Sequence, residues 1–443
     1  MATITARAPT SLYADRVGLL GTEQAFAFTA LIREAEERGQ DVIRCNLGQP
    51  DFPLPAHIGR AVRQAIEDGY TTYCDAQGLL ELRRAVGRDV AARRGLSEID
   101  PDRVVIYPGA RAPIGFAQQT YCQPGDEVVY PTPGYPLFES FIRYVGAVPR
   151  PICLREDAGF AFSGEDLAEV VGDRTRLVFL NFPSNPTGGV ATPEQLRSVA
   201  EVLRPLADEG LRVYSDESYE SIVFDGREHG SIASLPGMEA CTIIVSGVSK
   251  TYSWTGGRVG WAVYPTVEEA RIHRNLNINY FASISPYNQI GARVAIESPE
   301  SGPAVERMVT AFQERRDVTA ALLNEVEGVR CLKPQGAFYV FPNVEGLLER
   351  LGALEAYGAL EPGIRERTSP ATLFQLFLLF RHGVATMDRR SFGVLESEGQ
   401  HYLRVSVATA REDLERAVGL IDRAGRDVEG FGAFVREERH LWL

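Results

Sequence analysis

The sequence predicts an α/β fold built on a largely parallel sheet with helices on both faces. From about residue 60 to about residue 265, short apolar strands alternate with helical segments, a pattern typical of parallel sheets. The strands are apolar along their whole length, as strands covered on both faces are. They are Val104–Tyr107, Glu127–Tyr130, Leu177–Leu180, Arg212–Ser215 and Thr242–Val245. The 443 residues, 44% of them hydrophobic, are enough for a second domain.

Apolar periodicity identifies the other elements of the first part of the chain. It predicts helices at Phe26–Arg38, Glu81–Arg94 and Pro193–Leu206, and a strand at Asp41–Asn46. The segment Glu306–Val326 has the pattern of a long, charged, amphipathic helix. We expect this helix to cross from the first domain to a second one.

The C-terminal part predicts a smaller α+β domain. Strand-like runs occur at Gly336–Phe341 and Tyr402–Val407, and a helix is predicted at Glu412–Arg423. The apolar run Thr372–Phe380 is too short to span a membrane, so we interpret it as a buried helix. Residues 345–370 combine glycine, proline and charge, which indicates a surface insertion.

These elements predict two domains and an N-terminal arm. Residues 1–20 would form the arm, and residues 58–320 would form the large domain. Residues 21–57 and 321–443 would together form a discontinuous small domain.

The composition excludes several classes of function. A formal net charge of −13 argues against the basic surface that nucleic-acid binding needs. The six cysteines include no C-x-x-C pair, and the six histidines show no zinc-type spacing, so neither a disulfide framework nor a metal site is expected. The first residues lack the apolar core of a signal peptide, and no run is long enough to cross a membrane. We therefore expect a cytoplasmic protein.

One lysine stands in a setting that suits covalent chemistry. Lys250 follows the strand Thr242–Val245 in a loop of small residues, and Arg258 comes eight residues later. An amine held between apolar core and glycine-rich backbone can form an imine with an aldehyde cofactor. The arginine and the nearby hydroxyls suit a phosphate. Such a lysine is more often a solvated loop residue, so the interpretation depends on the other motifs.

Two further motifs follow predicted strands. Asn185, in Asn-Pro-Thr-Gly-Gly, belongs either to a simple turn or to a loop whose amide donates to a ligand oxygen. Asp216 lies at the carboxyl end of a strand, where open α/β sheets bind ligands. It is either a helix cap or the partner of a protonated ring nitrogen, with Tyr219 donating to a phenolate oxygen.

Two basic residues complete the set. The small residues around Ala110 and Arg111 precede a predicted helix, so their backbone N–H groups could bind an anion, although a purely structural turn explains them as well. Arg404 lies in a strand-like run and is either a surface charge or a bidentate clamp for a carboxylate. Taken together, the five motifs match pyridoxal phosphate and an α-amino acid.

On these residues the chain resembles the pyridoxal-phosphate-dependent aminotransferases of class I/II, the aspartate aminotransferase superfamily, from about residue 15 to 424. The resemblance implies a large domain with a mainly parallel seven-stranded sheet and a smaller α+β domain. The matching motifs, in family order, are LGQPDFPLP, YTTYCDAQGLLELRRAV, GDEVVYPTPGYPLFE, NFPSNPTGG, SDESY, SGVSKTYSWTGGRVG, GAFYVFP and YLRVSVA.

The resemblance implies roles for the residues that act on the cofactor ring. Lys250 would be the Schiff-base lysine and would move the proton during transfer. Asp216 would keep the pyridine nitrogen protonated, while Tyr219 and Asn185 would donate to the phenolate oxygen. Tyr135 would stack on the ring face.

The same resemblance implies a phosphate site. Arg258, the backbone of Ala110 and Arg111, and a hydroxyl from Ser246 or Ser249 would hold the phosphate.

Three other residues would complete the substrate site. Tyr73 would reach the phosphate from the neighbouring subunit, which implies a homodimer with shared sites. Arg404 would bind the substrate carboxylate together with Asn185, and the Gly48 backbone would lie close to the substrate.

The chain departs from the family pattern in a few places. Gly257 stands where many members have tryptophan before the phosphate arginine, and Trp254 stands where a smaller apolar residue is usual. Gly247 replaces a serine that many members have three residues before the lysine. We expect Trp254 and the loop at 386–393 to shape the substrate pocket.

The resemblance implies a ping-pong transamination between an L-amino acid and a 2-oxo acid. The alternative is a β- or γ-elimination on the same scaffold, and a third reading is a non-catalytic regulator that binds the cofactor. Arg111 either faces the phosphate or binds the distal carboxylate of a dicarboxylic substrate. Tyr13, Phe26, Phe28 and Phe281 could line an apolar substrate pocket instead.

Overall fold

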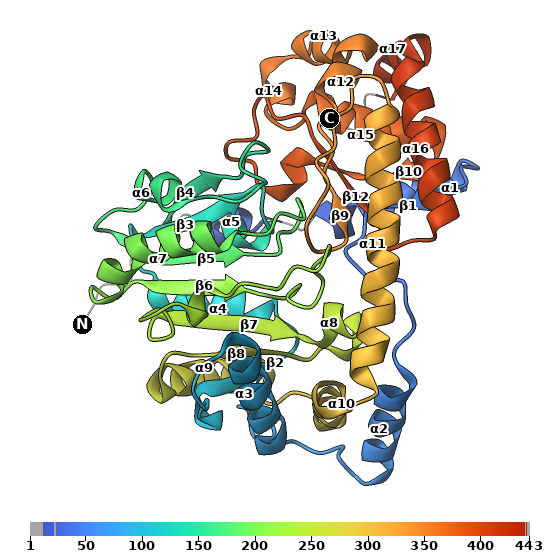
Figure 1. The fold of residues 1–443 in the computed structure, drawn as a ribbon. Coiled ribbons are helices and arrows are strands. Elements are labelled where there is room, and N and C mark those ends of the chain that lie inside the picture. Colours follow the sequence, from blue (N-terminus) through green and yellow to red (C-terminus); the bar gives the residue numbers. More distant parts are fainter. Residues whose placement is uncertain (1–11, 22–23, 439, 441–443) are drawn as a thin grey trace.

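A computed structural model describes residues 12–21, 24–438 and 440 (Figure 1). Its centre is a seven-stranded sheet in which β8 runs opposite to the other six strands. The predicted α/β fold with a mainly parallel sheet of seven strands is therefore confirmed. In spatial order the strands are β2 (Val104–Tyr107), β8 (Gly260–Val263), β7 (Thr242–Gly247), β6 (Arg212–Asp216), β5 (Thr175–Asn181), β3 (Glu127–Thr132) and β4 (Val148–Cys153).

Both faces of the sheet are buried, because neighbouring residues of each strand point to opposite sides. In β2, Val105 and Tyr107 pack with α4, α5 and α9 on one face. Val104 and Ile106 pack with α2, α3 and α10 on the other. The helices of this domain are α2 (Ala56–Glu67), α3 (Leu80–Arg94), α4 (Ala112–Tyr121), α5 (Leu137–Tyr144), α6 (Gly164–Ala168), α7 (Pro193–Ala207), α8 (Val248–Thr251), α9 (Val267–Phe281) and α10 (Pro286–Glu297).

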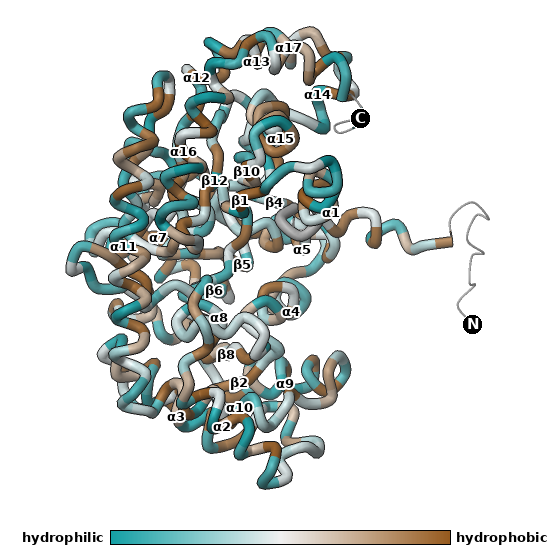
Figure 2. Tube along the Cα trace, turned by 90° about the vertical axis from the view of Figure 1, so that its right-hand side faces the viewer, coloured by the Kyte–Doolittle hydropathy of each residue, from teal (hydrophilic) through white to brown (hydrophobic). Residues whose placement is uncertain are grey.

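The helix α11 (Ser301–Glu325) runs along the molecule from the large domain to a second group of elements (Figure 1). Hydrophilic and hydrophobic residues alternate along it (Figure 2), and Phe312 packs edge-on against Phe52 and beside Phe338. The observed helix begins five residues before the predicted start, Glu306.

The second group of elements contains two small sheets. Strand β1 (Ile43–Arg44) pairs in parallel with β10 (Val384–Ala385), and the antiparallel sheet has the order β11 (Met387–Asp388), β12 (Leu403–Ser406) and β9 (Tyr339–Val340). The helices here are α1 (Gln24–Glu37), α12 (Glu345–Leu351), α13 (Ala353–Gly358), α14 (Pro362–Arg365), α15 (Pro370–His382), α16 (Arg411–Arg426) and α17 (Val428–Glu437).

The segment 345–370, which the sequence predicts to be a surface insertion, is largely helical. It folds into α12, α13 and α14, and Leu347, Leu348 and Leu351 are buried in the core. Glycine and proline mark the ends of these short helices rather than a loop: Gly352 ends α12 in the left-handed conformation, and Pro362 begins α14.

The apolar helix α15 is buried in this second core, as the sequence predicts. Of the helices in the described part of the chain, none is both long and apolar enough to cross a membrane.

Candidate active site

A cavity of about 230 Å³ opens at one edge of the large sheet. Six strands point the same way and end at this edge, and the segments after five of them line the cavity. They contribute Ala110 and Arg111 after β2, Tyr135 after β3, Asn181 and Asn185 at and after β5, Asp216, Ser218 and Tyr219 at and after β6, and Gly247, Ser249 and Lys250 at and after β7.

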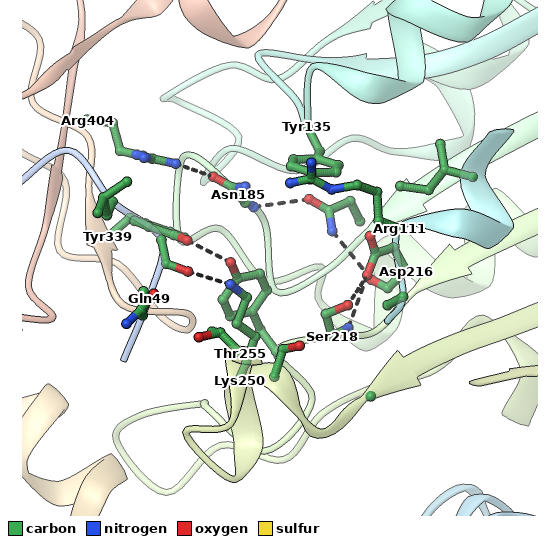
Figure 3. A pocket seen from close by; sticks show the side chains of 18 of the residues that line it. Gln49, Arg111, Tyr135, Asn185, Asp216, Ser218, Lys250, Thr255, Tyr339 and Arg404 are labelled. Carbon is green, nitrogen blue, oxygen red and sulfur yellow. Dashed lines mark hydrogen bonds between the residues drawn. The ribbon is translucent and has the colours of Figure 1, made fainter. Parts of the chain in front are cut away.

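The small sheets close the cavity from the opposite side. Leu47, Gly48 and Gln49 follow β1, while Tyr339 and Arg404 belong to β9 and β12 (Figure 3). The parallel pairing of β1 with β10 and the hydrogen bond from Ser406 N to Cys45 O fix these segments to one another. The cavity therefore lies between residues that are distant in sequence.

Lys250 is the amine of this site. The sequence contains two lysines, Lys250 and Lys333. Lys333 is 54% exposed and forms an ion pair with Asp317 at 2.9 Å. Lys250 is partly buried, donates to Gly48 O, and lies 5.8 Å from the centre of the Tyr219 ring. Any chemistry here that needs a lysine side chain must therefore use Lys250.

Asp216 is a buried carboxylate at the end of β6. It accepts hydrogen bonds from the backbone N–H of Ser218 at 3.1 Å and from its hydroxyl at 2.7 Å. Burial raises the pKa of Asp216 above its ordinary value, because these two hydrogen bonds do not offset the loss of water around the charge. A cationic N–H donor bound in the cavity would relieve that cost.

Arg404 lies at the other end of the cavity. It is 3% exposed, and its guanidinium donates to Asn185 Oδ1 at 3.0 Å and to Asn46 O. In the described residues it forms no ion pair with a carboxylate. A buried guanidinium bonded only to neutral oxygens favours an anionic ligand.

Arg258 and Arg111 lie together at the mouth of the cavity, and both are exposed. Arg258 donates to two carbonyl oxygens, Thr255 O and Pro108 O, each at 2.9 Å. Partial burial and the positive charge of Arg111 lower the pKa of Arg258. Gly109 has a positive φ of 89°, and a side chain there would lie 2.4 Å from the Arg258 guanidinium. The glycine lets the backbone before α4 approach this cationic end, which suits a phosphate.

A buried ionic cluster supports the strand ends behind the cavity. Arg94 donates to Glu217 at 2.9 Å and also to Glu220, His229 lies 2.8 Å from Glu217, and Ser246 donates to Glu220 at 2.8 Å. Burial alone would raise the pKa of Glu217, but the charges of Arg94 and His229 outweigh it and hold that pKa well below its ordinary value. The cluster joins α3 to the ends of β6 and β7.

The cavity brings together most of the residues singled out in the sequence. Those that line it are Gly48, Ala110, Arg111, Tyr135, Asn185, Asp216, Tyr219, Ser249, Lys250, Arg258 and Arg404.

Two of those residues lie elsewhere. Ser246 is buried in the ionic cluster and does not line the cavity, because its hydroxyl points to Glu220. Tyr73 is 87% exposed and lies outside the cavity of its own chain.

The apolar alternatives are also placed outside the cavity. Tyr13, Phe28 and Phe281 do not line it, and the side chain of Phe26 lies outside what the structure describes.

Several lining residues were not singled out in the sequence. They are Leu47, Gln49, Ile114, Asn181, Ser218, Thr255 and Tyr339. Most stand within the recognised motifs, so proximity to a motif was the available signal. Tyr339 lies in GAFYVFP, but the motif does not indicate that its hydroxyl reaches 2.6 Å from that of Tyr219.

The expectation that Trp254 shapes the pocket is wrong. Trp254 does not line the cavity. Its ring occupies the space beside two glycines, since a Cβ at Gly257 would lie 2.4 Å from it and one at Gly291 would lie 2.7 Å from it. The tryptophan at 254 and the glycine at 257 are therefore complementary. A side chain at Gly247 would lie 2.9 Å from the backbone of Val259 and Gly260, so a serine does not fit there.

Comparison with known proteins shows the family of the chain. Residues 40–421 match the family described as Aminotransferase class I and II. The chain is 33% identical to an aspartate aminotransferase of Geobacillus stearothermophilus over 93% of this chain and 98% of that one. It is 32% identical to an aspartate/prephenate aminotransferase of Cereibacter sphaeroides over 92% and 97%.

Solved structures show the same fold. The aspartate aminotransferase from Rhizobium meliloti superposes with a TM-score of 0.83 at 29% identity, covering 94% of this chain and 99% of that one. An aromatic aminotransferase from Pyrococcus horikoshii superposes with a TM-score of 0.78 at 30% identity, covering 90% and 100%.

The fold and the cavity thus define an enzyme of the aspartate aminotransferase type. The chain belongs to the aminotransferase class I and II family, whose members use pyridoxal 5′-phosphate, and it is an aminotransferase.

The raised pKa of Asp216 predicts that this residue lowers the stability of the ligand-free protein. A carboxylate whose folded-state pKa is raised costs stability as the pH rises from its ordinary pKa through the folded one. We expect Asp216→Asn to raise the melting temperature of the ligand-free protein at neutral pH by about 1–3 °C, measured by calorimetry.

Asp225→Asn provides the contrast, because the hydrogen bonds from Arg316 lower the pKa of Asp225. That variant should lose stability at neutral pH. A loss for Asp216→Asn equal to that of Asp225→Asn would contradict the account of Asp216.

Proposed function

We propose that the chain moves an amino group between an L-amino acid and a 2-oxo acid in two half-reactions, with pyridoxal 5′-phosphate bound in the cavity. The observation that carries this proposal is the charge of the lining residues. Arg111, Lys250, Arg258 and Arg404 are basic and Asp216 is acidic, so the formal excess is three positive charges. A phosphate monoester, with a charge of about −2, and one carboxylate would neutralise it.

The residues present fit that cofactor. Arg258, Ser249 and the N–H groups around Ala110 and Arg111 would hold the phosphate, with Thr255 as a further hydroxyl. Ser246 is engaged with Glu220, which favours Ser249. Tyr135 would cover one face of the ring, and its own ring already lies 5.9 Å from the Arg111 guanidinium.

The bound cofactor supplies an electron-accepting ring that stabilises negative charge at the substrate α-carbon. Asp216, whose ionisation burial disfavours, would pair with the ring nitrogen and keep it protonated. Tyr219 and Asn185 would donate to the ring oxygen. Arg404 would hold the substrate carboxylate in a two-pronged hydrogen bond, with Asn185 beside it. Lys250 Nζ is the amine that would bond to the cofactor aldehyde and then carry the proton.

We also propose a homodimer. The cationic end of the cavity, with Arg111 and Arg258, is exposed in the single chain. Tyr73 is exposed as well, and Asp75, two residues later, forms an ion pair with Arg274 of α9 at 3.0 Å. Tyr280, on α9, is 58% exposed. A second copy would cover these aromatic side chains, and Tyr73 of the partner subunit would reach the phosphate.

The first prediction concerns the half-reaction. With cofactor but without acceptor, an aminotransferase should release one equivalent of 2-oxo acid per chain from L-glutamate or L-aspartate and lose its visible absorption band. Adding 2-oxoglutarate should restore the band. Lys250→Ala should lower the rate at least about 10²- to 10⁴-fold, and Lys333→Ala should leave it unchanged. Continuous release of oxo acid and ammonia without acceptor would instead identify an elimination enzyme.

A second prediction concerns Arg111. The positive charge of Arg111 lowers the pKa of Arg258, so both charges lie at the end of the cavity that would hold the phosphate. We expect Arg111→Ala to weaken cofactor binding, because it removes one of these charges. It should reduce kcat/KM by a similar factor for dicarboxylic and monocarboxylic amino acids. A loss confined to aspartate and glutamate would show instead that Arg111 binds the distal carboxylate of a dicarboxylic substrate. Aspartate, a substrate of this class, appears in the names of two relatives.

A third prediction concerns the dimer. Tyr73→Phe should weaken cofactor affinity several-fold although Tyr73 lies outside the cavity of its own chain, and Tyr70→Phe should not. Sedimentation should give the mass of two chains. A monomer with unchanged affinity in Tyr73→Phe would contradict the shared site.

A further inference from the structure

Tyr339 occupies the junction between the two halves of the cavity. It lies on β9, is 1% exposed, and yet lines the cavity. Its hydroxyl is 2.6 Å from the hydroxyl of Tyr219, which follows β6 of the large sheet. This hydrogen bond joins the small antiparallel sheet to the residue that faces the ring oxygen in the proposed function.

The backbone at Gly48 shows how closely the Tyr339 hydroxyl is confined. Gly48 does not have a positive φ, so its conformation alone does not require glycine. A Cβ at this position would lie 2.2 Å from the Tyr339 hydroxyl oxygen. Glycine is therefore needed here because Tyr339 has a hydroxyl, and the same glycine accepts a hydrogen bond from Lys250 through its carbonyl.

The ring of Tyr339 has a second contact, with the carboxylate-binding arginine. The guanidinium carbon of Arg404 lies 4.6 Å from the centre of the Tyr339 ring and 4.6 Å from that of Phe392. The two rings hold the guanidinium between them, which fixes its plane. The 3-10 helix Arg389–Phe392, which follows β11, thus acts on the site by supporting Arg404.

The hydroxyl pair leaves one question of direction, because each phenol has a single proton. If Tyr339 donates to Tyr219, then the Tyr219 proton can point into the cavity. If Tyr219 donates to Tyr339, that proton is used within the pair. Burial raises the pKa of Tyr219 well above its ordinary value, so Tyr219 remains a donor, with Lys250, Asp216 and Arg404 as the charged groups around it.

We propose that the Tyr339 hydroxyl donates a hydrogen bond to the Tyr219 hydroxyl oxygen, so that the Tyr219 hydroxyl donates its own hydrogen bond to the cofactor ring oxygen. The aromatic ring of Tyr339 fixes the Arg404 guanidinium. Tyr339 is then a positioning residue for both the ring oxygen and the substrate carboxylate. This inference rests on the proposed function, since it assigns the ring oxygen as the acceptor of Tyr219.

The test is the pH at which the visible band of the cofactor-loaded protein changes. A hydrogen-bond donor to the ring oxygen would favour the high-pH form of the cofactor-loaded protein. In that form the ring oxygen would carry a negative charge and would share no proton. Tyr339→Phe keeps the ring and removes the hydroxyl, so it should raise the midpoint by about 0.3 pH units or more. Tyr219→Phe should raise it further, and adding Tyr339→Phe to that variant should change nothing.

Tyr402→Phe is the matched control. Tyr402 also lies beside β12, stacks on Phe341, and donates to Glu156 outside the cavity. The pH midpoint of the visible band in Tyr402→Phe should equal that of the wild type. An unmoved or lowered midpoint in Tyr339→Phe would overturn the inference, because a lowered midpoint means that Tyr219 donates to Tyr339. A wild-type protein without a visible band would overturn the proposed function, and this inference with it.

A second measurement needs no cofactor. When introduced into the wild-type chain, Gly48→Ala should lower the melting temperature, because the new Cβ displaces the Tyr339 hydroxyl. The same substitution should cost clearly less in the Tyr339→Phe background, where the nearest remaining ring atom is 3.3 Å away. An equal decrease in melting temperature in both backgrounds would show that the Cβ does not displace the Tyr339 hydroxyl, and it would contradict the inference.

Discussion

The direction of the sheet strands is the constraint on which the rest of the structure depends. Six strands point the same way and end at one edge, and five of them are followed by segments with polar side chains that line the cavity. The strands are apolar on both faces because helices cover both sides of the sheet. The lysine, the acid and the asparagine are therefore placed within one cavity by a core that has no chemistry of its own.

Two adjacent residues show how the site divides stability from function. Glu217 faces away from the cavity, and the charges around it favour its ionisation, so it stabilises the fold at neutral pH. Asp216 faces the cavity, and within the described part of the chain its buried carboxylate accepts only the two hydrogen bonds from Ser218. The fold thus tolerates an unfavourable charge where a ligand cation would bind, and the ionic cluster next to it holds the strand end in place.

Much of the fold and most of the cavity could be predicted from local sequence signals. The strands before Asn185, Asp216 and Lys250 are continuous apolar runs, and the residues after them belong to recognisable motifs. Contacts between distant segments could not be predicted in this way. The hydroxyl of Tyr339 forms a hydrogen bond with that of Tyr219, which is 120 residues away in the sequence. The Ser246 hydroxyl points away from the cavity because it donates a hydrogen bond to Glu220. Composition alone also did not indicate that residues 345–370 form short helices that bury leucines between the glycines and prolines.

The central claim is that Lys250 is the amine that bonds to the cofactor, and the scarcity of lysine makes this directly measurable. Borohydride reduction of the cofactor-loaded protein would fix any imine as a stable secondary amine, and peptide mass spectrometry would locate it. The account predicts one cofactor mass per chain on the peptide that contains Lys250 and none on the peptide that contains Lys333. Label on Lys333, or no label on either lysine in a protein that has bound the cofactor, would contradict it.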